Sequence, residues 1–297
     1  MSFFLSSFKT TYEPFHISVI GLGFVGGAML KSFREKGCNV VGYDKYKPEY
    51  SNTFEQCCET NISFLCLPTV FDESNHSYDK SCIIEVCKKY SKKAYKGAIV
   101  IKSTVEPGTC NILSEMFPNL HIIHNPEFLT ASTAYEDFHN QTHVVLGKGE
   151  NTSEDKVERV SDFYKQYYPL AEISLCEAIE SESMKIYVNC FYATKIQFFN
   201  ELYALTNKTG GNYEVIRELM LKNKWINPMH TLVPGTDNKL SYGGGCFPKD
   251  TNALVSHMKR LDSPFLVLDA VIKERNLMRT DHTNVKLSTT KEDNKSL

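Results

Sequence analysis

Short apolar runs alternate with amphipathic segments along the first half of the chain. The runs predict β-strands at residues 16–20, 39–43, 62–66, 98–102, 120–123, 143–146 and 172–175. The amphipathic segments predict helices that end at residue 36 or cover residues 80–91, 110–117 and 154–167. Strands separated by helices imply a parallel sheet with right-handed crossovers. The predicted fold class is therefore α/β, with a Rossmann-like, doubly wound parallel sheet.

The pattern changes after residue 177, where the strand signals stop. Residues 180–207 contain no Gly or Pro and predict one helix of about 40 Å at roughly 1.5 Å per residue. Its apolar residues are numerous enough to predict burial of more than one face. Further helices are predicted at residues 213–222, up to residue 260, and at 264–279, with a loop at 225–239. The second unit is therefore predicted to be all-helical, built on a long central helix.

These patterns divide the chain into four parts. We expect a lead at residues 1–15, a Rossmann-like dinucleotide-binding domain at 16–177 and a helical central domain at 178–280. Residues 281–297 are polar and show no periodicity, which predicts a disordered tail.

Composition excludes several classes of protein. The net charge of −2 argues against a nucleic-acid binder, and no apolar run reaches the roughly 20 residues that span a bilayer. The N-terminal segment lacks a basic leader and is not interpreted as a signal peptide. The ten cysteines are scattered and form no Cys-x-x-Cys pair, so neither a disulfide scaffold nor a metal site is predicted. A reducing, cytoplasmic compartment fits this usage.

A glycine motif between the first two predicted strands indicates the cofactor. The segment Gly21-Leu22-Gly23-Phe24-Val25-Gly26 follows one strand, opens a helix, and precedes an acidic residue, Asp44, at the end of the next strand. Glycines at these positions let the backbone approach a pyrophosphate at the helix N-terminus. A carboxylate at Asp44 would accept from a ribose 2′-OH and repel a 2′-phosphate. The motif therefore predicts NAD rather than NADP.

Polar residues follow three of the predicted strands. Ligands of such sheets bind beyond the carboxyl ends of the strands, where this chain has Pro68-Thr69, Ser103-Thr104 and Asn125-Pro126-Glu127-Phe128-Leu129. Thr104 offers a hydroxyl and Glu127 a carboxylate. For either residue taken alone, a loop hydroxyl or a solvated acid is the simpler interpretation.

Two features of the second half carry candidate chemistry. Lys185 and Asn189 are four residues apart on one face of the central helix, so they would stabilise an oxyanion together or form a polar stripe. Further on, Tyr242-Gly243-Gly244-Gly245-Cys246-Phe247-Pro248-Lys249-Asp250 leads a glycine run into a cysteine. Pro248 suits the first position of a helix, which would put Cys246 at the helix N-terminus. There the helix dipole and Lys249 would lower the thiol pKa, and Asp250 would hold a water or a proton nearby. The alternative is a glycine turn with a buried thiol.

Taken in order over residues 16–280, these motifs resemble the UDP-glucose/GDP-mannose dehydrogenase family. The Asn-Pro-Glu-Phe-Leu and Gly-Gly-x-Cys-Phe-Pro-Lys-Asp stretches are the specific ones. The resemblance implies oxidation of a sugar-nucleotide alcohol to a carboxylate with two NAD⁺, as in conversion of UDP-glucose to UDP-glucuronate, an acid used in polysaccharide synthesis. It implies Cys246 as the nucleophile that forms a thiohemiacetal and then a thioester. Lys185 and Asn189 would stabilise the reacting oxygen, Asp250 would handle protons, and Glu127 would activate water placed by Thr104.

Two ligand sites are therefore expected. The cofactor site would comprise Gly21, Gly23, Phe24, Val25, Gly26, Asp44, Pro68, Thr69, Ser103, Thr104 and Lys249. The sugar-nucleotide site would comprise Glu127, Phe128, Leu129, Thr130, Lys185, Asn189, His230, Tyr242, Gly243, Gly244 and Gly245.

The chain also departs from the family pattern. Thr130 to Ser132 stand where a second acid and a glycine are usual, and Trp225-Ile226 replaces an Arg-Ile pair. The chain stops about where a third, nucleotide-gripping domain would begin, so His230, Lys239 and the 232–245 loop are candidate substitutes. The family's central helix builds a dimer interface, and we expect a homodimer through it here.

Other functions stay open on the sequence. GDP-mannose or a UDP-N-acetylhexosamine would suit the same machinery. A two-electron β-hydroxyacid dehydrogenase needs the lysine and asparagine but no cysteine, so Cys246 argues against it. A degenerate NAD-binding regulatory protein would explain the missing domain and acid, but every proposed catalytic side chain is retained.

Overall fold

The computed structural model describes residues 14–50, 52–130, 132–281 and 285–286. Its main feature is a seven-stranded sheet of order β2-β1-β3-β6-β7-β8-β9. The strands are β1 (His16–Ile20), β2 (Asn39–Tyr43), β3 (Ile62–Leu65), β6 (Ala98–Ile101), β7 (His121–His124), β8 (His143–Lys148) and β9 (Glu172–Glu177). The chain passes from β1 to β2 on one side and then to β3 on the other, so the strand order reverses beside β1. Such a reversal opens a crevice at the carboxyl ends of the strands.

Two strands, β8 and β9, run against the predicted all-parallel arrangement. β8 pairs with β7 in the antiparallel sense, while every other neighbouring pair in this sheet is parallel. Only helix α5 (Ala134–His139) lies between β7 and β8. Its six residues extend about 9 Å at roughly 1.5 Å per residue, too short to carry the chain back across the sheet. The chain therefore turns directly into β8 at the carboxyl edge. The predicted doubly wound α/β class is confirmed, with this correction.

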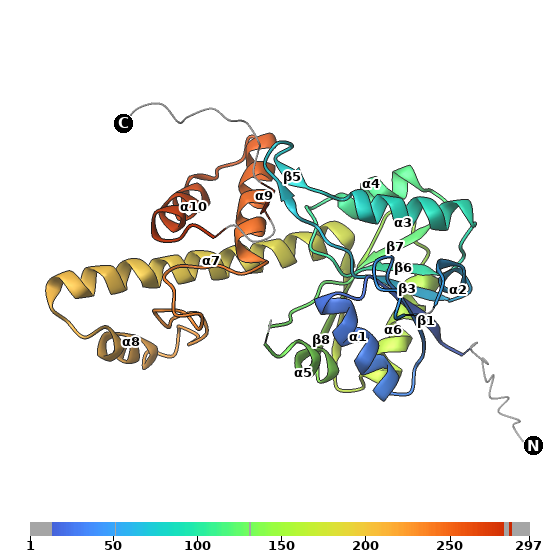
Figure 1. The fold of residues 1–297 in the computed structure, drawn as a ribbon, viewed down its shortest axis with the longest axis horizontal. Helices are drawn as coiled ribbons and strands as arrows, with labels where there is room; N and C mark the ends of the chain where they lie inside the picture. The colour runs from blue at the N-terminus through green and yellow to red at the C-terminus, as the bar shows by residue number, and fades with distance from the viewer. Residues whose placement is uncertain (1–13, 51, 131, 282–284, 287–297) are drawn as a thin grey trace, which may run out of the picture.

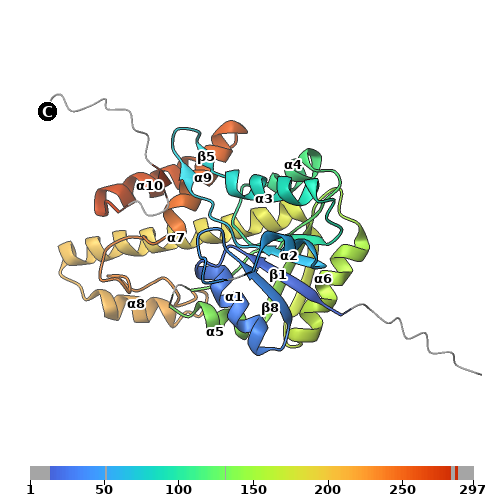
Figure 2. The same ribbon diagram turned by 45° about the vertical axis from the view of Figure 1, so that its right-hand side comes forward.

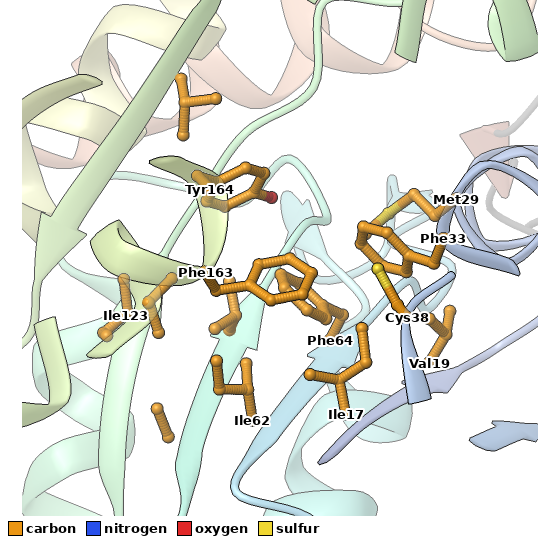
Figure 3. Close-up of a cluster of buried hydrophobic side chains, with 14 of the residues drawn as sticks. Ile17, Val19, Met29, Phe33, Cys38, Ile62, Phe64, Ile123, Phe163 and Tyr164 are labelled. Carbon is orange, nitrogen blue, oxygen red and sulfur yellow. The ribbon is translucent and has the colours of Figure 1, made fainter. Parts of the chain in front are cut away.

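Helices cover both faces of the sheet because its central strands are apolar on both sides. The helices of one face are α1 (Phe24–Glu35) and α6 (Glu154–Tyr167), and those of the other are α2 (Phe54–Cys58), α3 (Ser81–Lys92) and α4 (Thr109–Met116). Under the first face, Phe33, Phe64 and Phe163 are fully buried with their ring centroids 5.3–5.7 Å apart (Figure 3). The short helices α2 and α5 were not predicted.

A 32-residue helix, α7 (Ala178–Thr209), connects the sheet to the helical part (Figure 1). Its first turns contact the sheet domain, where Glu182 accepts from the backbone N–H groups of Gly108 (2.6 Å) and Cys110 (2.7 Å). Its far half carries α8 (Tyr213–Leu221), while α9 (Phe247–Arg260) and α10 (Leu266–Met278) lie against its middle (Figure 2). Five of its large side chains stay about half exposed, so burial does not extend to every face: Ile179, Tyr187, Phe191, Phe198 and Leu205. Within the described ranges, no helix is both long and apolar enough to cross a membrane.

A small second sheet joins the two parts of the molecule and was not predicted. Strands β4 (Phe71–Asp72) and β5 (Ser77–Tyr78) form an antiparallel hairpin, and β10 (Val285–Lys286) pairs with β4. The predicted disorder is therefore wrong for β10, which gains backbone hydrogen bonds from β4. It is also wrong for Asp281, whose carboxylate pairs with Arg275 and Arg279. The remaining tail residues lie outside the described ranges.

Candidate active site

The glycine motif forms the turn between β1 and α1, and each glycine has a different reason to lack a side chain. Gly21 has φ of +84°, a conformation that side chains disfavour. A Cβ on Gly26 would lie 1.9 Å from the carbonyl oxygen of Gly21, so Gly26 lets the helix approach the turn. A Cβ on Gly23 would meet nothing within 4 Å among the described residues. Gly23 therefore faces open space at the N-terminus of α1, which fits a pyrophosphate.

Asp44 ends β2 beside this turn. Its carboxylate accepts from the backbone N–H of Leu22 at 2.7 Å and of Tyr46 at 2.9 Å. The Nζ of Lys47 donates to the carbonyl oxygen of Leu22 at 2.6 Å. The acid is thus held rigidly against the glycine turn, with lone pairs left for a ribose hydroxyl.

The ends of β3 and β6 are joined by two hydroxyls that the sequence singled out. Ser103 Oγ donates to the carbonyl oxygen of Leu67 at 2.6 Å and accepts from its N–H at 3.1 Å. Thr69 Oγ1 donates to the carbonyl oxygen of Thr104 at 2.8 Å. These bonds fix the two strand ends relative to each other, which shapes the floor of the crevice.

Glu127 follows β7 and meets the central helix. Its Oε1 lies 3.2 Å from the Nζ of Lys185, and its Oε2 accepts from the N–H of Leu129 at 2.7 Å. Both charged side chains of this ion pair are largely buried. The neighbouring Phe128 ring stacks on His143 at 6.0 Å, and the Lys185 ammonium lies 5.4 Å from the Phe128 ring centroid. The pair therefore links the sheet domain to α7 at the predicted catalytic residues.

A buried lysine supports this turn and was not predicted. Lys102, at the end of β6, is 2% exposed and donates to Asn125 Oδ1 at 2.8 Å and to the carbonyl oxygen of Pro126 at 3.2 Å. Burial lowers the pKa of Lys102 to about 8. The buried hydroxyl of Tyr164 donates to the same Asn125 oxygen at 2.5 Å. The position of Glu127 thus rests on a buried polar network.

Cys246 is the N-cap of α9, as predicted, while Pro248 is the second helical residue rather than the first. Gly244, with φ of +75°, makes the turn into it. All ten cysteines lie within the described ranges, and only Cys246 is classed as exposed. It opens into a concave surface, so neighbouring protein atoms still displace much of its water.

The expected lowering of the Cys246 pKa is wrong. Burial raises the pKa of the thiol above 9.0, and the negative charges of Asp250 and Glu127 raise it further. Lys249 and Lys185 act in the opposite direction without reversing the shift. The sequence argument counted Lys249 and the helix terminus but not the two carboxylates.

Asp250 stands behind the cysteine and is fully buried. Its Oδ1 accepts from Lys249 Nζ at 2.5 Å and from the hydroxyl of Tyr78, and its Oδ2 accepts from Asn189 Nδ2 at 2.6 Å. A carboxylate enclosed by three donors holds side chains in place. Its full burial and three donors favour this supporting role over the water or proton carrier that the sequence suggested.

A single cavity of about 700 Å³ connects the glycine turn to the cysteine. The predicted residues that line it are Gly21, Gly23, Phe24, Val25, Asp44, Pro68, Thr69, Ser103, Thr104, Glu127, Gly245, Cys246 and Lys249. Lys102 lines it as well. The fold thus brings residues more than 200 positions apart in sequence to one crevice. A dinucleotide and a second substrate would meet in it.

Several predicted substrate residues lie away from the cavity wall. Tyr242 is 2% exposed, with its hydroxyl 3.4 Å from Thr251 Oγ1, so its side chain supports the motif from beneath. Thr130 donates its N–H to Asp137 at 2.8 Å on the exposed surface. His230 lies between Tyr192 and Phe247, at centroid distances of 4.8 and 5.6 Å. The other predicted substrate residues outside the lining are Phe128, Leu129, Lys185, Asn189, Gly243 and Gly244; the predicted cofactor residue Gly26 and the predicted catalytic residue Asp250 also lie outside it.

The 232–245 loop is held by charge. Arg279 Nη2 lies 2.6 Å from Asp237 Oδ2, and a Cβ on Gly243 would fall 2.0 Å from that guanidinium. Lys239 lies 3.9 Å from Asp281. In the parts of the chain that the structure describes, no group of three or more His, Cys, Asp or Glu side chains is arranged to hold a metal.

Comparisons with known proteins point to one enzyme family. Residues 47–168 match the sequence profile of the UDP-glucose/GDP-mannose dehydrogenase family, NAD binding domain, and residues 179–276 match that family's central domain. A UDP-glucose 6-dehydrogenase of Rickettsia bellii is 33% identical over 240 residues, covering 76% of this chain and 52% of the relative. UDP-glucose 6-dehydrogenase YwqF of Bacillus subtilis is 30% identical, covering 88% of this chain and 66% of the relative.

The fold has a matching solved structure. A UDP-glucose dehydrogenase from Pyrobaculum islandicum superposes with a TM-score of 0.76 at 25% identity, covering 90% of this chain and 69% of that chain. The chain thus spans about half to two thirds of the length of these relatives.

Proposed function

Because the chain belongs to the UDP-glucose/GDP-mannose dehydrogenase family, we propose that it oxidises the C6 alcohol of UDP-glucose to the carboxylate of UDP-glucuronate. Its first domain is an NAD-binding domain. The observation that carries the proposal is the exposed thiol of Cys246 in the cavity that the glycine turn also lines. A simple alcohol dehydrogenase has no use for a nucleophile there, whereas a double oxidation does.

The residues of the crevice fit a dinucleotide. Gly23 leaves open space for a pyrophosphate at the N-terminus of α1, and Asp44 presents acceptor atoms to a ribose. Bound NAD⁺ supplies the hydride acceptor, and two NAD⁺ per sugar account for the four electrons. The chain's own groups must then hold the carbon, stabilise its oxygen and move protons.

Cys246 supplies the covalent step. Its sulfur bonds to the carbonyl carbon of the intermediate aldehyde, and the thiol proton ends on the former carbonyl oxygen. Loss of a hydride and of that hydroxyl proton converts the thiohemiacetal to a thioester. Water then adds to the thioester carbon, the carbon–sulfur bond breaks, and the sulfur takes up a proton. A thiolate serves both as nucleophile and as leaving group, which suits these roles.

Four other side chains assist this sequence in the proposal. The Lys185 ammonium and the second amide hydrogen of Asn189 stabilise the oxygen on the reacting carbon. Glu127 lines the same cavity as Cys246 and takes the proton of the attacking water. Thr104, which also lines that cavity, orients the water.

The decisive test counts electrons. Purified protein is incubated with NAD⁺ and a panel of UDP- and GDP-sugars, and NADH is measured per acid formed. We expect two NADH per UDP-glucuronate. One NADH per turnover with a small hydroxyacid would point to a β-hydroxyacid dehydrogenase. No NADH formation with any sugar nucleotide would point to an NAD-binding regulator. Preference for GDP-mannose or a UDP-N-acetylhexosamine would keep the chemistry and change the substrate.

A matched pair of variants isolates the cysteine. Cys246→Ser should abolish acid formation and leave NAD binding unchanged. Cys82→Ser alters another cysteine of the cavity wall and should still give two NADH per acid. Full-rate acid formation by Cys246→Ser would refute the covalent mechanism.

We further propose that the protein is a homodimer through α7. Tyr187, Phe191, Phe198 and Leu205 are 52–62% exposed along this helix, and a second copy would bury them. Light scattering should give twice the chain mass, and Phe191→Arg should give the monomer. A wild-type mass of one chain would refute the proposal.

A further inference from the structure

The hairpin of β4 and β5 belongs in sequence to the sheet domain but contacts the helical domain. It contacts α9, and Phe71 and Tyr78 are buried in one cluster with Ile186, Cys190 and Leu254 (Figure 1). The last residue of the hairpin, Tyr78, is 2% exposed. Its ring is thus fixed between the two domains.

Tyr78 is anchored at both ends. Its backbone N–H donates to Glu106 Oε1 at 2.8 Å, and Glu106 Oε2 accepts from Lys80 Nζ at 2.5 Å. Glu106 is buried in the loop that continues from Ser103 and Thr104. At the other end the phenol hydroxyl donates to Asp250 Oδ1. One residue therefore ties the loop after β6 to α9, the helix that Cys246 caps.

The acceptor of this bond organises the catalytic face. Asp250 also accepts from Lys249, whose ammonium lies 4.6 Å from the Tyr78 ring centroid, and from Asn189. Lys249 lines the cavity with Cys246, and Asn189 shares the α7 face with Lys185. A shift of the Asp250 carboxylate would therefore displace a cavity-lining cation and a predicted oxyanion donor together.

We propose that Tyr78 is a positioning residue that, through Asp250, sets where Lys249 and Asn189 stand relative to Cys246. It acts in the reaction through Asp250 and does not line the cavity itself. Its catalytic consequence rests on the proposed function; its effect on the thiol does not. Burial and the charge of Asp250 raise the pKa of Tyr78 well above its ordinary value, so the hydroxyl keeps its proton and remains a donor throughout the working range.

The test substitutes Tyr78→Phe, which keeps the ring and removes the hydroxyl. Tyr90→Phe is the matched control, because Tyr90 is equally buried but bonds to Ser63 at 2.7 Å within the sheet domain. Both variants are assayed well below their unfolding midpoints, so that folded protein is compared with folded protein. With UDP-glucose and NAD⁺, Tyr78→Phe should lower kcat about tenfold and change KM for NAD⁺ less than about twofold, the size expected for one hydrogen bond to a charged group. Tyr90→Phe should leave both within about twofold of wild type.

A second readout needs neither substrate nor cofactor. The rate of Cys246 alkylation by iodoacetamide is followed against pH, since the thiolate is the reacting form. The charges that bear on the thiol are Asp250 and Lys249 on α9, Glu127 after β7, and Lys185 on α7. Removing the Tyr78 hydroxyl leaves the negative charge of Asp250 less compensated, so the alkylation curve should shift to higher pH in Tyr78→Phe and not in Tyr90→Phe.

A double substitution checks the route of the effect. In an Asp250→Asn background, Tyr78→Phe should change alkylation much less than it does in the wild type, because the coupled partner is already lost. Unchanged alkylation and kcat in Tyr78→Phe would overturn the proposal, as would equal effects of Tyr78→Phe and Tyr90→Phe. If no variant or wild type oxidises UDP-glucose, the proposed function fails, while the alkylation curves still decide the role of Tyr78.

Discussion

Adding one methyl group at Gly26 tests the close contact between α1 and the glycine turn. A Cβ there would lie 1.9 Å from the carbonyl oxygen of Gly21 and 3.1 Å from Cys66 Cβ. The backbone must therefore move by about 1 Å, and overpacking of this kind lowers the free energy of unfolding by roughly 1–3 kcal/mol or more. The helix preference of alanine over glycine returns about 1 kcal/mol. We expect a net loss of about 2 kcal/mol, which lowers the unfolding midpoint by about 4–8 °C in a chain of this size.

The same methyl group at Gly23 should act mainly on binding. Gly23 is the N-cap of α1, with φ of −72° and ψ of −148°, and its Cβ would meet no described atom within 4 Å. Alanine is a poorer N-cap than glycine, so Gly23→Ala should cost about 1 kcal/mol of stability, less than Gly26→Ala. The methyl would occupy the space where a pyrophosphate meets the helix N-terminus. We expect the Kd for NAD⁺ to rise at least about tenfold, or roughly 1.4 kcal/mol.

Thermal unfolding and calorimetric NAD⁺ titration of the two variants separate the effects. Gly26→Ala should lose more stability than Gly23→Ala, and Gly23→Ala should lose more affinity for NAD⁺. A Gly23→Ala variant with wild-type affinity would mean that the dinucleotide does not bind over this turn. A Gly26→Ala variant as stable as wild type would mean that the turn tolerates the displacement that the geometry demands.

Three further predictions follow from buried charge. Burial lowers the pKa of Lys102 from 10.5 to about 8, so the charge of Lys102 destabilises the folded state below pH 8, and this destabilisation fades as the pH rises toward 10.5. Lys102→Met removes the charge, so its gain in unfolding free energy over wild type, measured by urea denaturation, should be about 2 kcal/mol smaller at pH 9.5 than at pH 7. Glu182 accepts from two backbone N–H groups, and in Glu182→Gln one of them would face an amide NH₂, so the free energy of unfolding should fall by about 2–3 kcal/mol. The control Glu201→Gln, on the exposed surface of α7, should stay within about 0.5 kcal/mol of wild type. Alkylation of Cys246 should keep accelerating through pH 9, because the thiol pKa is raised, and NAD⁺ should slow it at every pH by covering the cavity.

Local sequence chemistry was sufficient to place the glycine turn beside Asp44. Gly21 and Gly26 each need glycine for a reason that acts within one turn, and Asp44 follows directly on the adjacent strand. Motifs at strand ends were also placed correctly at one edge, because parallel strands align their carboxyl ends. Cys246 was correctly assigned to a helix N-terminus because Pro248, two residues on, favours the first turn of a helix.

The supports of the site escaped sequence reasoning because they depend on distant contacts. Each strand of the 71–78 hairpin has two residues, too few to show a period, and Tyr78 acts on a residue 172 positions away. Lys102 at a strand end is typical of a solvated lysine, and only the fold encloses it. The direction of β8 likewise depends on the length of α5, whose six residues give a weak helical signal.

The raised pKa of Cys246 bears on how the proposed chemistry distributes its protons. Addition of a thiol across an aldehyde is proton-neutral, because the S–H proton ends on the oxygen while sulfur bonds to carbon. Sulfur must lose its proton as it attacks, but the aldehyde oxygen takes a proton up in the same step, so a thiol that rests protonated at neutral pH is compatible with the overall addition. A base is needed afterwards, when the thiohemiacetal loses its hydroxyl proton and when water attacks the thioester. In the proposed mechanism Glu127, which pairs with Lys185 and lines the cavity with Cys246, serves as the base for both. The protein should therefore alkylate slowly at pH 7 and still oxidise its substrate, and loss of Glu127 should stall the reaction after the sulfur–carbon bond has formed.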